Sequence, residues 1–317
     1  MEIIYEYIIN EESIMDKLCV ISVYFNPAKY KALLENYLYF SSQIKKQQIK
    51  LITVECAFDG DPFQIPKEEG VYQLRSNSVM WQKERLINYG ISRLPDDCDY
   101  FAWIDGDIIL PDNWQDIAIQ ELQKSDIIQL YKKVYHLPKG LKNHDGSKVP
   151  FLQSVLWQKL IHKNWLQRRK AKELSFSTPG FAWAAKRDLF QNLNIYDKNI
   201  VGSGDTFIVD CLLDSWDIHG FAQKFTPAMK EHMLDYCNLL RKRNPKIGYL
   251  PIDICHLYHG SLKNRSYMDR HQAILDNNYD PMNDIALVND VYEWASNKTS
   301  MHESIKNYFF SRLEDDE

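Results

Sequence analysis

The chain has 317 residues, of which 45% are hydrophobic and 26% charged, a balance typical of a folded globular protein and not of a disordered or fibrous one. Its 43 Asp and Glu outnumber its 38 Lys and Arg, and this net negative charge disfavours nucleic acid as the main partner. No apolar run approaches the roughly 18 residues of a membrane helix, and Glu2 stands where a signal peptide would carry a basic residue. We therefore expect no transmembrane segment and a cytoplasmic location.

Short apolar runs alternate with helical patterns over residues 18–131, which is typical of βαβ units and a mostly parallel sheet. Residues 1–17 precede this region as an N-terminal extension without an assigned role. In chain order, the expected elements are a strand over 18–25, a helix from Asn26-Pro27, strands over 49–58 and 71–74, a helix over 80–92, a strand over 100–104, a helix over 114–123 and a strand over 127–131.

The second half of the chain has a less regular pattern. It is basic through about residue 172, and then apolar and rich in glycine from about residue 176. The expected elements are helices near 207–213 and 230–242, a strand over 252–255 and helices over 267–275 and 284–295, followed by an acidic tail.

Six cysteines are spread along the chain, mostly inside apolar runs. They are Cys19, Cys56, Cys98, Cys211, Cys237 and Cys255. None forms the C-x-x-C spacing of zinc or redox sites. We expect all six to be reduced and buried.

Asp105-Gly106-Asp107 directly follows the strand expected over 100–104. Two carboxylates at this spacing can converge on one divalent cation, or on a ribose hydroxyl together with that cation. The alternative is an acidic surface turn, which the apolar residues on both sides of the triplet disfavour. Burying two carboxylates without a cation or donors would cost several kcal/mol. The triplet therefore indicates a divalent-cation site at the end of a strand, with or without a ribose hydroxyl.

Two histidines, His256 and His259, follow the strand expected over 252–255. Imidazole is a common ligand for manganese-like metals, so either one could complete a site begun by Asp107, although a histidine beside a strand is more often structural. Farther on, Lys263 and Arg265 could neutralise a diphosphate leaving group or could lie in a solvated loop.

Glycine-rich segments in the second half suggest contacts with a sugar. In Gly202-Ser-Gly-Asp205, small residues let a ligand approach the backbone, and the acid could accept a proton from a hydroxyl; a helix N-cap is the alternative role of Asp205. Trp183, near Gly180, could stack on a sugar ring, although most tryptophans are core residues. The basic segment 159–172 could attract an acidic acceptor or form a solvated helix face.

Several of these pieces, in this order and spacing, resemble the metal-dependent glycosyltransferases of the GT-A fold, in particular those related to glycosyltransferase family 2. They are Val20-Ile-Ser-Val-Tyr-Phe-Asn-Pro27, Lys83-Glu-Arg-Leu-Ile-Asn-Tyr-Gly90, Tyr100-Phe-Ala-Trp-Ile-Asp-Gly-Asp107, Gly180-Phe-Ala-Trp-Ala-Ala-Lys-Arg187 and Gly202-Ser-Gly-Asp205. The resemblance covers roughly residues 18–271. It implies a single α/β domain of GT-A type (Rossmann-like), with a mixed, mostly parallel sheet flanked by helices. Within it we expect a nucleotide-sugar-binding half over 18–131, an acceptor-binding and catalytic half over 132–283 and a C-terminal helical tail over 284–317.

The resemblance implies transfer of a sugar from a nucleotide-sugar, in particular a UDP-sugar, to a hydroxyl of a glycan, lipid or protein acceptor, with Mn²⁺ or Mg²⁺ as cofactor. Asp205 would be the general base of an inverting reaction, with retention as the open alternative; the family often has two consecutive acids where this chain has Asp205-Thr206. The implied metal ligands are Asp105, Asp107 and His259, favoured over His256. The implied donor-binding residues are Tyr24, Asn26, Glu55, Arg85, Asn88, Asp105, Lys263 and Arg265, and the acceptor-binding ones are Gly180, Trp183 and Gly204.

Two other classes of function stay open. A sugar-nucleotide nucleotidyltransferase would ordinarily carry a glycine-rich phosphate loop after its first strand, and Phe25-Asn-Pro-Ala28 is not such a loop. A non-catalytic carbohydrate-binding relative would have no need for the acid at Asp205. The lack of a Gln-x-x-Arg-Trp segment speaks against a processive polysaccharide synthase.

Overall fold

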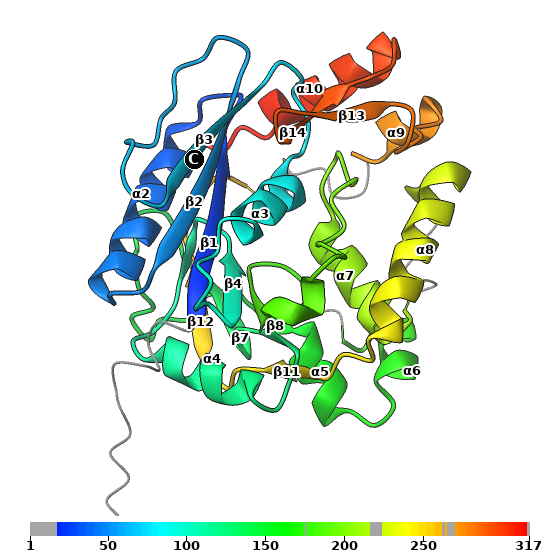
Figure 1. Ribbon diagram of the computed structural model, residues 1–317. Coiled ribbons are helices and arrows are strands. Elements are labelled where there is room, and N and C mark those ends of the chain that lie inside the picture. The colour runs from blue at the N-terminus through cyan, green and yellow to red at the C-terminus, as the bar shows by residue number, and fades with distance from the viewer. Residues whose placement is uncertain (1–17, 175, 216–223, 262–263, 265–269, 316–317) are drawn as a thin grey trace, which may run out of the picture.

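The computed structural model describes residues 18–174, 176–215, 224–261, 264 and 270–315 (Figure 1). A seven-stranded sheet in the order β11-β6-β10-β4-β1-β2-β3 forms its centre. Every neighbouring pair is parallel except the two pairs made by β10, which is antiparallel to both β4 and β6. The strands are β1 (Leu18–Phe25), β2 (Leu51–Phe58), β3 (Val71–Ser76), β4 (Tyr100–Ile104), β6 (Ile127–Gln129), β10 (Ala182–Lys186) and β11 (Ile247–Tyr249).

Helices cover both faces of this sheet, which explains why its strands read as continuous apolar runs. Along β1, Cys19 and Ile21 belong to one hydrophobic core, and Leu18 and Val20 to the other. One face packs against α2 (Lys31–Lys46) and α4 (Trp114–Leu122), and the opposite face against α3 (Lys83–Ile91), α7 (Gly204–Leu213) and α8 (Pro227–Lys242). The result is a three-layer α/β arrangement.

A second sheet of five strands, in the order β5-β12-β7-β8-β9, lies at the carboxyl end of β4. It consists of β5 (Ile108–Ile109), β7 (Lys133–His136), β8 (Phe151–Ser154), β9 (Ser177–Thr178) and β12 (Asp253–His256). β5 begins directly after the Asp105-Gly106-Asp107 turn, and its pairing with β12 places His256 opposite Ile108. This pairing brings the two histidines of the second half to the acidic turn of the first. The shorter helices are α5 (Val155–Ile161), α6 (Trp165–Lys170), η1 (Arg187–Phe190) and α9 (Gln272–Asp276).

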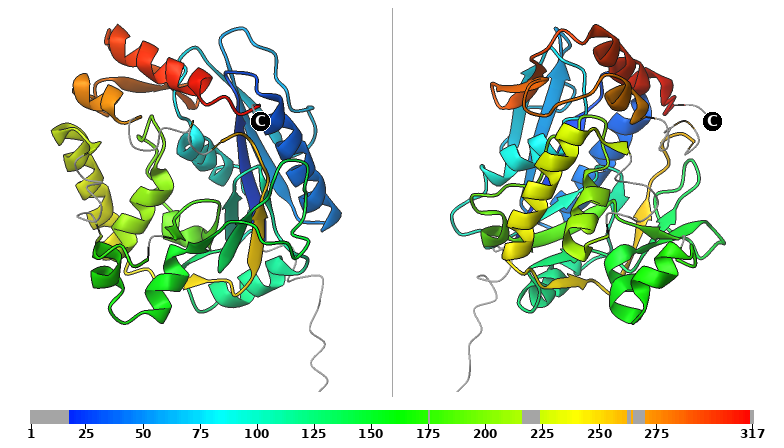
Figure 2. Two further views of the ribbon diagram at one scale, coloured as in Figure 1. Left: turned by 180° about the vertical axis from the view of Figure 1, so that it is seen from behind. Right: turned by 90° about the vertical axis from the view of Figure 1, so that its right-hand side faces the viewer.

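The prediction of a helix over 284–295 is wrong. This segment is a hairpin of β13 (Ile285–Val288) and β14 (Val291–Trp294), whose turn residues Asn289 and Asp290 both have positive φ. Positive φ at both central residues is the requirement of a type I′ turn, which Asn and Asp tolerate best after Gly. The C-terminal helix comes later, as α10 (Thr299–Ser311) in the stretch that we expected to be an acidic tail, and Figure 2 shows it beside the hairpin.

The helix expected from Asn26-Pro27 begins only at Lys31, with Tyr30 at the N-cap position, because the Asn26 side chain binds both backbone groups of Tyr30 in a turn. Most of the remaining predicted elements lie close to their predicted positions, and β1 and β4 have the predicted bounds. The predicted fold class is confirmed: the chain forms one α/β domain with a mixed, mostly parallel sheet flanked by helices. Residues 267–269 of the helix expected over 267–275 lie outside the described residues, and α9 occupies 272–276. Among the described helices, none combines the length and apolar character required to cross a bilayer.

The expectation of six reduced cysteines is wrong for two of them. Cys211 and Cys237 form a disulfide between α7 and α8, 26 residues apart in sequence, a separation that matches no local motif. Cys19, Cys56 and Cys98 are buried free thiols, and Cys255 is partly buried.

Candidate active site and metal centre

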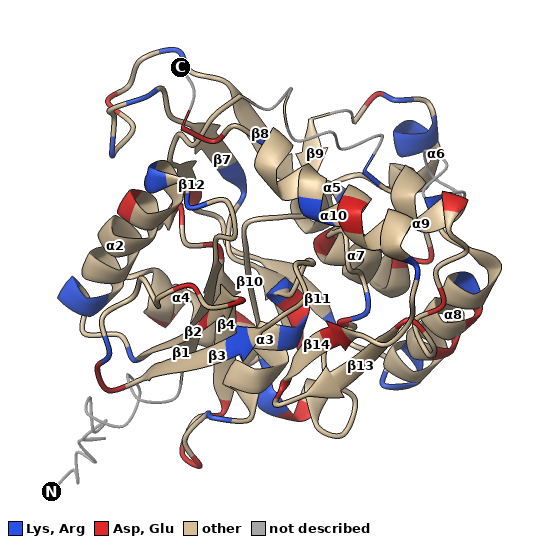
Figure 3. Cartoon of the chain, turned by 90° about the horizontal axis from the view of Figure 1, so that it is seen from above, with Lys and Arg blue, Asp and Glu red and all other residues tan. Residues whose placement is uncertain are grey.

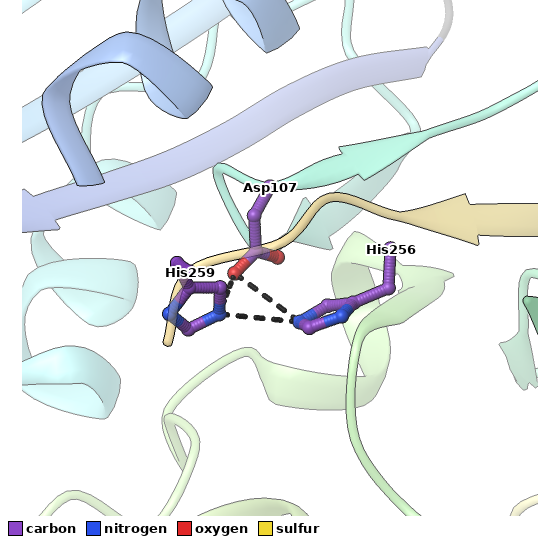
Figure 4. A group of neighbouring side chains, drawn as sticks. All are labelled: Asp107, His256 and His259. Atoms are coloured by element: carbon purple, nitrogen blue, oxygen red, sulfur yellow. Dashed lines mark hydrogen bonds and ion pairs between the residues drawn. The ribbon is translucent and has the colours of Figure 1, made fainter. Parts of the chain in front are cut away.

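Asp107, His256 and His259 form a buried group at the end of β4, the place where open α/β sheets bind ligands (Figure 4). His259 Nε2 lies 2.8 Å from Asp107 Oδ2, and His256 Nε2 lies 3.5 Å from the same oxygen. The two Nε2 atoms are 3.2 Å apart, so both rings direct the same nitrogen towards the carboxylate. Three ligand atoms within 4.8 Å of one another have the spacing of a metal site.

The chemistry of this donor set fits a divalent transition metal. Two neutral imidazoles and one carboxylate suit Mn²⁺-like ions better than Mg²⁺, which prefers oxygen ligands. Asp107 Oδ1 is buried and has no hydrogen-bond partner among the described residues, so a second carboxylate oxygen is also available. Burial disfavours the charged carboxylate, but His256 and His259 outweigh it and hold the pKa of Asp107 well below its usual range. Asp107 is therefore ionised, as a metal ligand must be.

Lys83, at the start of α3, joins the acidic turn to Asp205. Its Nζ lies 2.7 Å from Asp105 Oδ1 and 2.9 Å from Asp205 Oδ2. Asp105 thus contacts Lys83 and stands outside the group of three ligands. Burial, with Asp205 and Asp107 nearby, raises the pKa of Asp105 to about 6 although Lys83 lowers it. Lys83 was not among the predicted site residues, because a contact between positions 122 residues apart leaves no signal in one sequence.

Asp205 does not cap α7. The N-cap position is Ser203, with φ +78°, and Asp205 lies in the first turn with its carboxylate on Lys83. A Cβ at Gly180 would lie 3.7 Å from Asp205 Oδ2, so the glycine leaves open space beside this oxygen. A Cβ at Gly204 would overlap the Glu84 carboxylate, which makes the role of Gly204 one of packing between α7 and α3.

Glu84, next to Lys83, makes the free energy of unfolding depend on pH. Burial raises its pKa from 4.5 to about 8, although Lys83 lowers it. Between these two values the unfolded chain releases the proton and the folded chain keeps it, so Glu84 makes the free energy of unfolding fall as pH rises through this window. Replacing Glu84 by Gln removes this contribution. From pH 5 to pH 8 we expect the wild type to lose on the order of 3 kcal/mol of unfolding free energy that the variant does not lose, as measured by urea unfolding. A constant difference would contradict the assignment.

Three of the predicted donor-binding residues line one pocket at the ends of β1 and β2. They are Tyr24, Asn26 and Glu55. Asn26 Nδ2 donates to Tyr24 Oη at 3.0 Å, and Tyr24 Oη donates to Gln64 Oε1 at 2.6 Å. The Glu55 carboxylate is 2% exposed and accepts hydrogen bonds from the backbone N–H groups of Gln64 and Ile65. Glu55 therefore shapes the pocket by fixing the loop that forms its wall.

Arg85 and Asn88 face a different part of the chain. Asn88 Nδ2 donates to the Ile195 carbonyl at 2.7 Å and to Asp197 at 3.0 Å, and Asn88 Oδ1 accepts from the Ile195 N–H at 2.9 Å. Arg85 forms an ion pair with Asp197 at 3.5 Å. These contacts favour a structural role for both side chains over the expected donor-binding one.

The structural role can be tested on Asn88. Asn88→Ala would leave buried backbone groups of Ile195 unpaired, at a cost of about 1–3 kcal/mol in the free energy of unfolding. We expect the variant to unfold at lower urea concentration with an unchanged Michaelis constant for the donor. A raised Michaelis constant at unchanged stability would restore Asn88 to the donor site.

The structure also changes the expectation for Trp183. Its side chain has no exposed surface and stacks on Trp103 at 5.9 Å between ring centroids, while its Nε1 donates to the Pro179 carbonyl. It is a core residue of β10 and offers no face to an acceptor. Lys263 and Arg265 lie outside the described residues.

The basic segment 159–172 includes the end of α5 and all of α6. Figure 3 shows basic residues in blue on α6. Arg168 pairs with Glu173 at 2.9 Å, and the Arg169 guanidinium lies 5.1 Å from the centre of the Trp165 ring. These two arginines are thus engaged within their own segment.

His136 and Phe181 are part of the site but were missed by the sequence analysis. His136 is opposite His256 in the β7–β12 pairing, and their Nδ1 atoms are 3.2 Å apart. Phe181 has φ +84°, and its carbonyl accepts from the Asp105 N–H at 2.9 Å while its ring contacts His256. Both residues come from strands or loops far from the acidic turn in sequence, which gives them no local signature.

No protein-family model and no curated protein sequence matches the chain. Among solved structures, it is similar to glucosyl-3-phosphoglycerate synthase from Mycobacterium tuberculosis in complex with Mn²⁺, UDP and phosphoglyceric acid, at 13% identity and a TM-score of 0.41 over 83% of this chain and 80% of that one. The 4-diphosphocytidyl-2C-methyl-D-erythritol synthase of Anaerococcus prevotii matches at 12% identity and a TM-score of 0.34, over 76% of this chain and 89% of that one. The catalytic domain of Drosophila β1,4-galactosyltransferase 7 in complex with xylobiose matches at 12% identity and a TM-score of 0.29 over 62% of this chain. The chain spans 61% of that galactosyltransferase structure, and all three similarities are distant.

Proposed function

We propose that the chain is a metal-dependent glycosyltransferase of GT-A type that moves a sugar from a nucleotide-sugar, in particular a UDP-sugar, to a hydroxyl acceptor. The observation that carries the proposal is that two groups of side chains lie together near the end of β4. The first group is Asp107, His256 and His259, and the second is Lys83 with its two ion-pair partners, Asp105 and Asp205. The first group has the ligand atoms for a cation. The second includes the Asp205 carboxylate, which lies beside the open space at Gly180. A site for the charged leaving group thus lies next to a candidate proton acceptor.

Asp107, His256 and His259 would hold the cation, which supplies charge neutralisation for the departing diphosphate. The Lys83 ammonium adds a second positive charge between the acidic turn and Asp205. Asp105, when it is ionised, would accept a hydrogen bond from a ribose hydroxyl. Tyr24 and Asn26, which line the pocket at the ends of β1 and β2, would contact the base of the nucleotide.

Asp205 is the proposed general base. As the acceptor oxygen forms its bond to the anomeric carbon, the bond from that carbon to the diphosphate oxygen breaks, and the hydroxyl proton passes to Asp205 Oδ1 or Oδ2. The Lys83 contact fixes the carboxylate, and Gly180 leaves room beside it for the acceptor. One base without an evident carboxylate nucleophile favours inversion at the anomeric carbon, by the geometric logic of glycosidases.

A nucleotidyltransferase is the competing function. The Asn26 side chain holds the loop after β1, because it accepts a hydrogen bond from the Tyr30 N–H and donates one to the Tyr30 carbonyl. This loop contains no glycine. The glycine-rich loop whose backbone N–H groups cradle a triphosphate therefore has no counterpart at this position in the sequence.

A donor screen distinguishes the two functions. UDP-, GDP- and dTDP-sugars are incubated with the protein and Mn²⁺, with and without a chelator, and the released nucleotide is measured. We expect slow, Mn²⁺-dependent release of the nucleoside diphosphate from one class of donor. Release of pyrophosphate from a nucleoside triphosphate and a sugar phosphate, with no hydrolysis of any nucleotide-sugar, would overturn the proposal.

A further inference from the structure

The last described residues of the chain, 309–315, which we term the C-terminal strap, run from the end of α10 to the start of α2 (Figure 2). Tyr30 Oη donates to the Phe310 carbonyl at 2.8 Å and accepts from the Leu313 N–H at 3.0 Å. Asp315 accepts from the N–H groups of Lys31 and Ala32 at 3.0 and 2.8 Å, at the positive end of the α2 dipole. The strap is therefore fastened to α2 on both sides of Glu314.

Between these two sets of contacts with α2, the Glu314 side chain lies next to His259, one of the three candidate metal ligands. Its Oε1 lies 3.5 Å from His259 Nδ1, and its side chain is 1% exposed. A Cβ at Gly260, which has φ +80°, would lie 2.8 Å from Glu314 Cα, so only a glycine lets the strap come this close to the residue after His259. A fully buried carboxylate is costly unless a charge compensates it, and the Arg312 guanidinium pairs with the same oxygen.

Resting on the proposed metal-dependent function, we infer that Glu314 is a positioning residue for the metal ligand His259. The Nε2 of His259 faces Asp107, so its lone pair is available to a cation only when the ring proton is on Nδ1. A carboxylate next to Nδ1 stabilises that tautomer and fixes the orientation of the ring. Glu314 occupies this position, although it is far from both the acidic turn and His259 in sequence.

The second histidine has the same arrangement, which supports the inference independently. His256 directs Nε2 towards Asp107 and has its Nδ1 at 3.2 Å from His136 Nδ1. Each ring thus presents one nitrogen to the shared carboxylate and the other to a partner behind it. A pair of histidines oriented in this way is a built ligand set and not a chance contact.

The test is a titration of the full-length protein with Mn²⁺ in the absence of nucleotide, followed by the electron paramagnetic resonance signal of free Mn²⁺. Loss of an outer partner of a ligating histidine costs about 10- to 100-fold in metal affinity, and we expect this loss for Glu314→Ala. Glu314→Gln keeps an oxygen that can accept from Nδ1 and should recover part of the affinity. His259→Ala should lose far more.

Asp315→Asn is the matched control, because Asp315 is a strap carboxylate that contacts α2 and not His259. It should bind Mn²⁺ within about twofold of wild type, and thermal unfolding of the metal-free proteins checks that all variants fold. The visible spectrum of bound Co²⁺ should change in Glu314→Gln and stay unchanged in Asp315→Asn, since it reports on the ligands and not on stability. If the Glu314→Ala variant does not fold, the Mn²⁺ affinity and the Co²⁺ spectrum of Glu314→Gln test the role of Glu314.

Wild-type affinity in both Glu314 variants, with affinity lost in His259→Ala, would overturn the role of Glu314 and leave the proposed function in place. Equal losses in the Glu314 and Asp315 variants would show that the strap acts only through structure, which also overturns the role. A wild-type protein that binds neither Mn²⁺ nor Co²⁺ would refute the metal centre itself, and the metal-dependent function with it.

Discussion

Replacing Asp107 by Ala is expected to lower the affinity for Mn²⁺ by more than about 100-fold and to leave the fold intact. Asp107 supplies the carboxylate of the ligand group, and both histidines contact its Oδ2, so its loss removes the negative charge on which the cation depends. No core volume is lost, because the side chain lies at a turn between β4 and β5. Calorimetric titration with Mn²⁺ measures the effect.

Asp112→Ala is the matched control for this experiment. Asp112 is an exposed acid that follows β5, and its removal changes the net charge by the same amount. Near-wild-type affinity is expected for this variant. If Asp107→Ala bound Mn²⁺ as tightly as Asp112→Ala does, the group of three residues would not be the metal site.

Replacing Asp205 by Asn is expected to lower turnover by about 100-fold or more while leaving the affinities for UDP and Mn²⁺ unchanged. Asn nearly preserves the shape of Asp and can still accept a hydrogen bond from Lys83, but it cannot take a proton from the acceptor hydroxyl. Because the N-cap of α7 is Ser203, the loss would not reflect a missing cap. Turnover of the donor found in the screen is the measurement.

Asp214→Asn makes the same chemical change at the other end of α7, where the side chain is 77% exposed and pairs with Arg241. It should leave turnover unchanged. Near-normal turnover in Asp205→Asn would contradict the assignment. Two other acids, one on α7 and one on α8, would then be candidates for the base: Asp210 is buried and accepts a hydrogen bond from Ser215, and Glu231 is exposed.

The part of the fold that the sequence predicts well is the part governed by local pattern. β1 and β4 are uninterrupted apolar runs because both of their faces are covered, so their bounds can be read directly. The hairpin over 285–294 was mistaken for a helix because a short apolar segment fits both periods. Only the Asn289-Asp290 turn distinguishes the two, and its signal is weaker than that of Asn-Gly.

The group of Asp107, His256 and His259 is predictable for a similar reason, since each of these residues ends or follows an apolar strand, and strand ends meet at one edge of a sheet. Lys83, His136 and Glu314 could not be found in this way. Each is brought to the site by tertiary contacts over long distances in sequence, and nothing in the neighbouring residues marks them. Trp183 shows the converse, because its position near Gly180 suggested a sugar contact, whereas its register opposite Trp103 buries it.

The most direct test of the proposed function is the affinity of the protein for UDP, measured by calorimetry with saturating Mn²⁺ and again with a chelator. A cation held by Asp107, His256 and His259 and shared with the diphosphate must couple the two affinities, and coupling between bound ligands is typically about 5- to 150-fold. We predict that UDP binds tighter by at least the lower end of this range when Mn²⁺ is present. Equal affinity in Mn²⁺ and in chelator would contradict a metal-dependent nucleotide site at the end of β4.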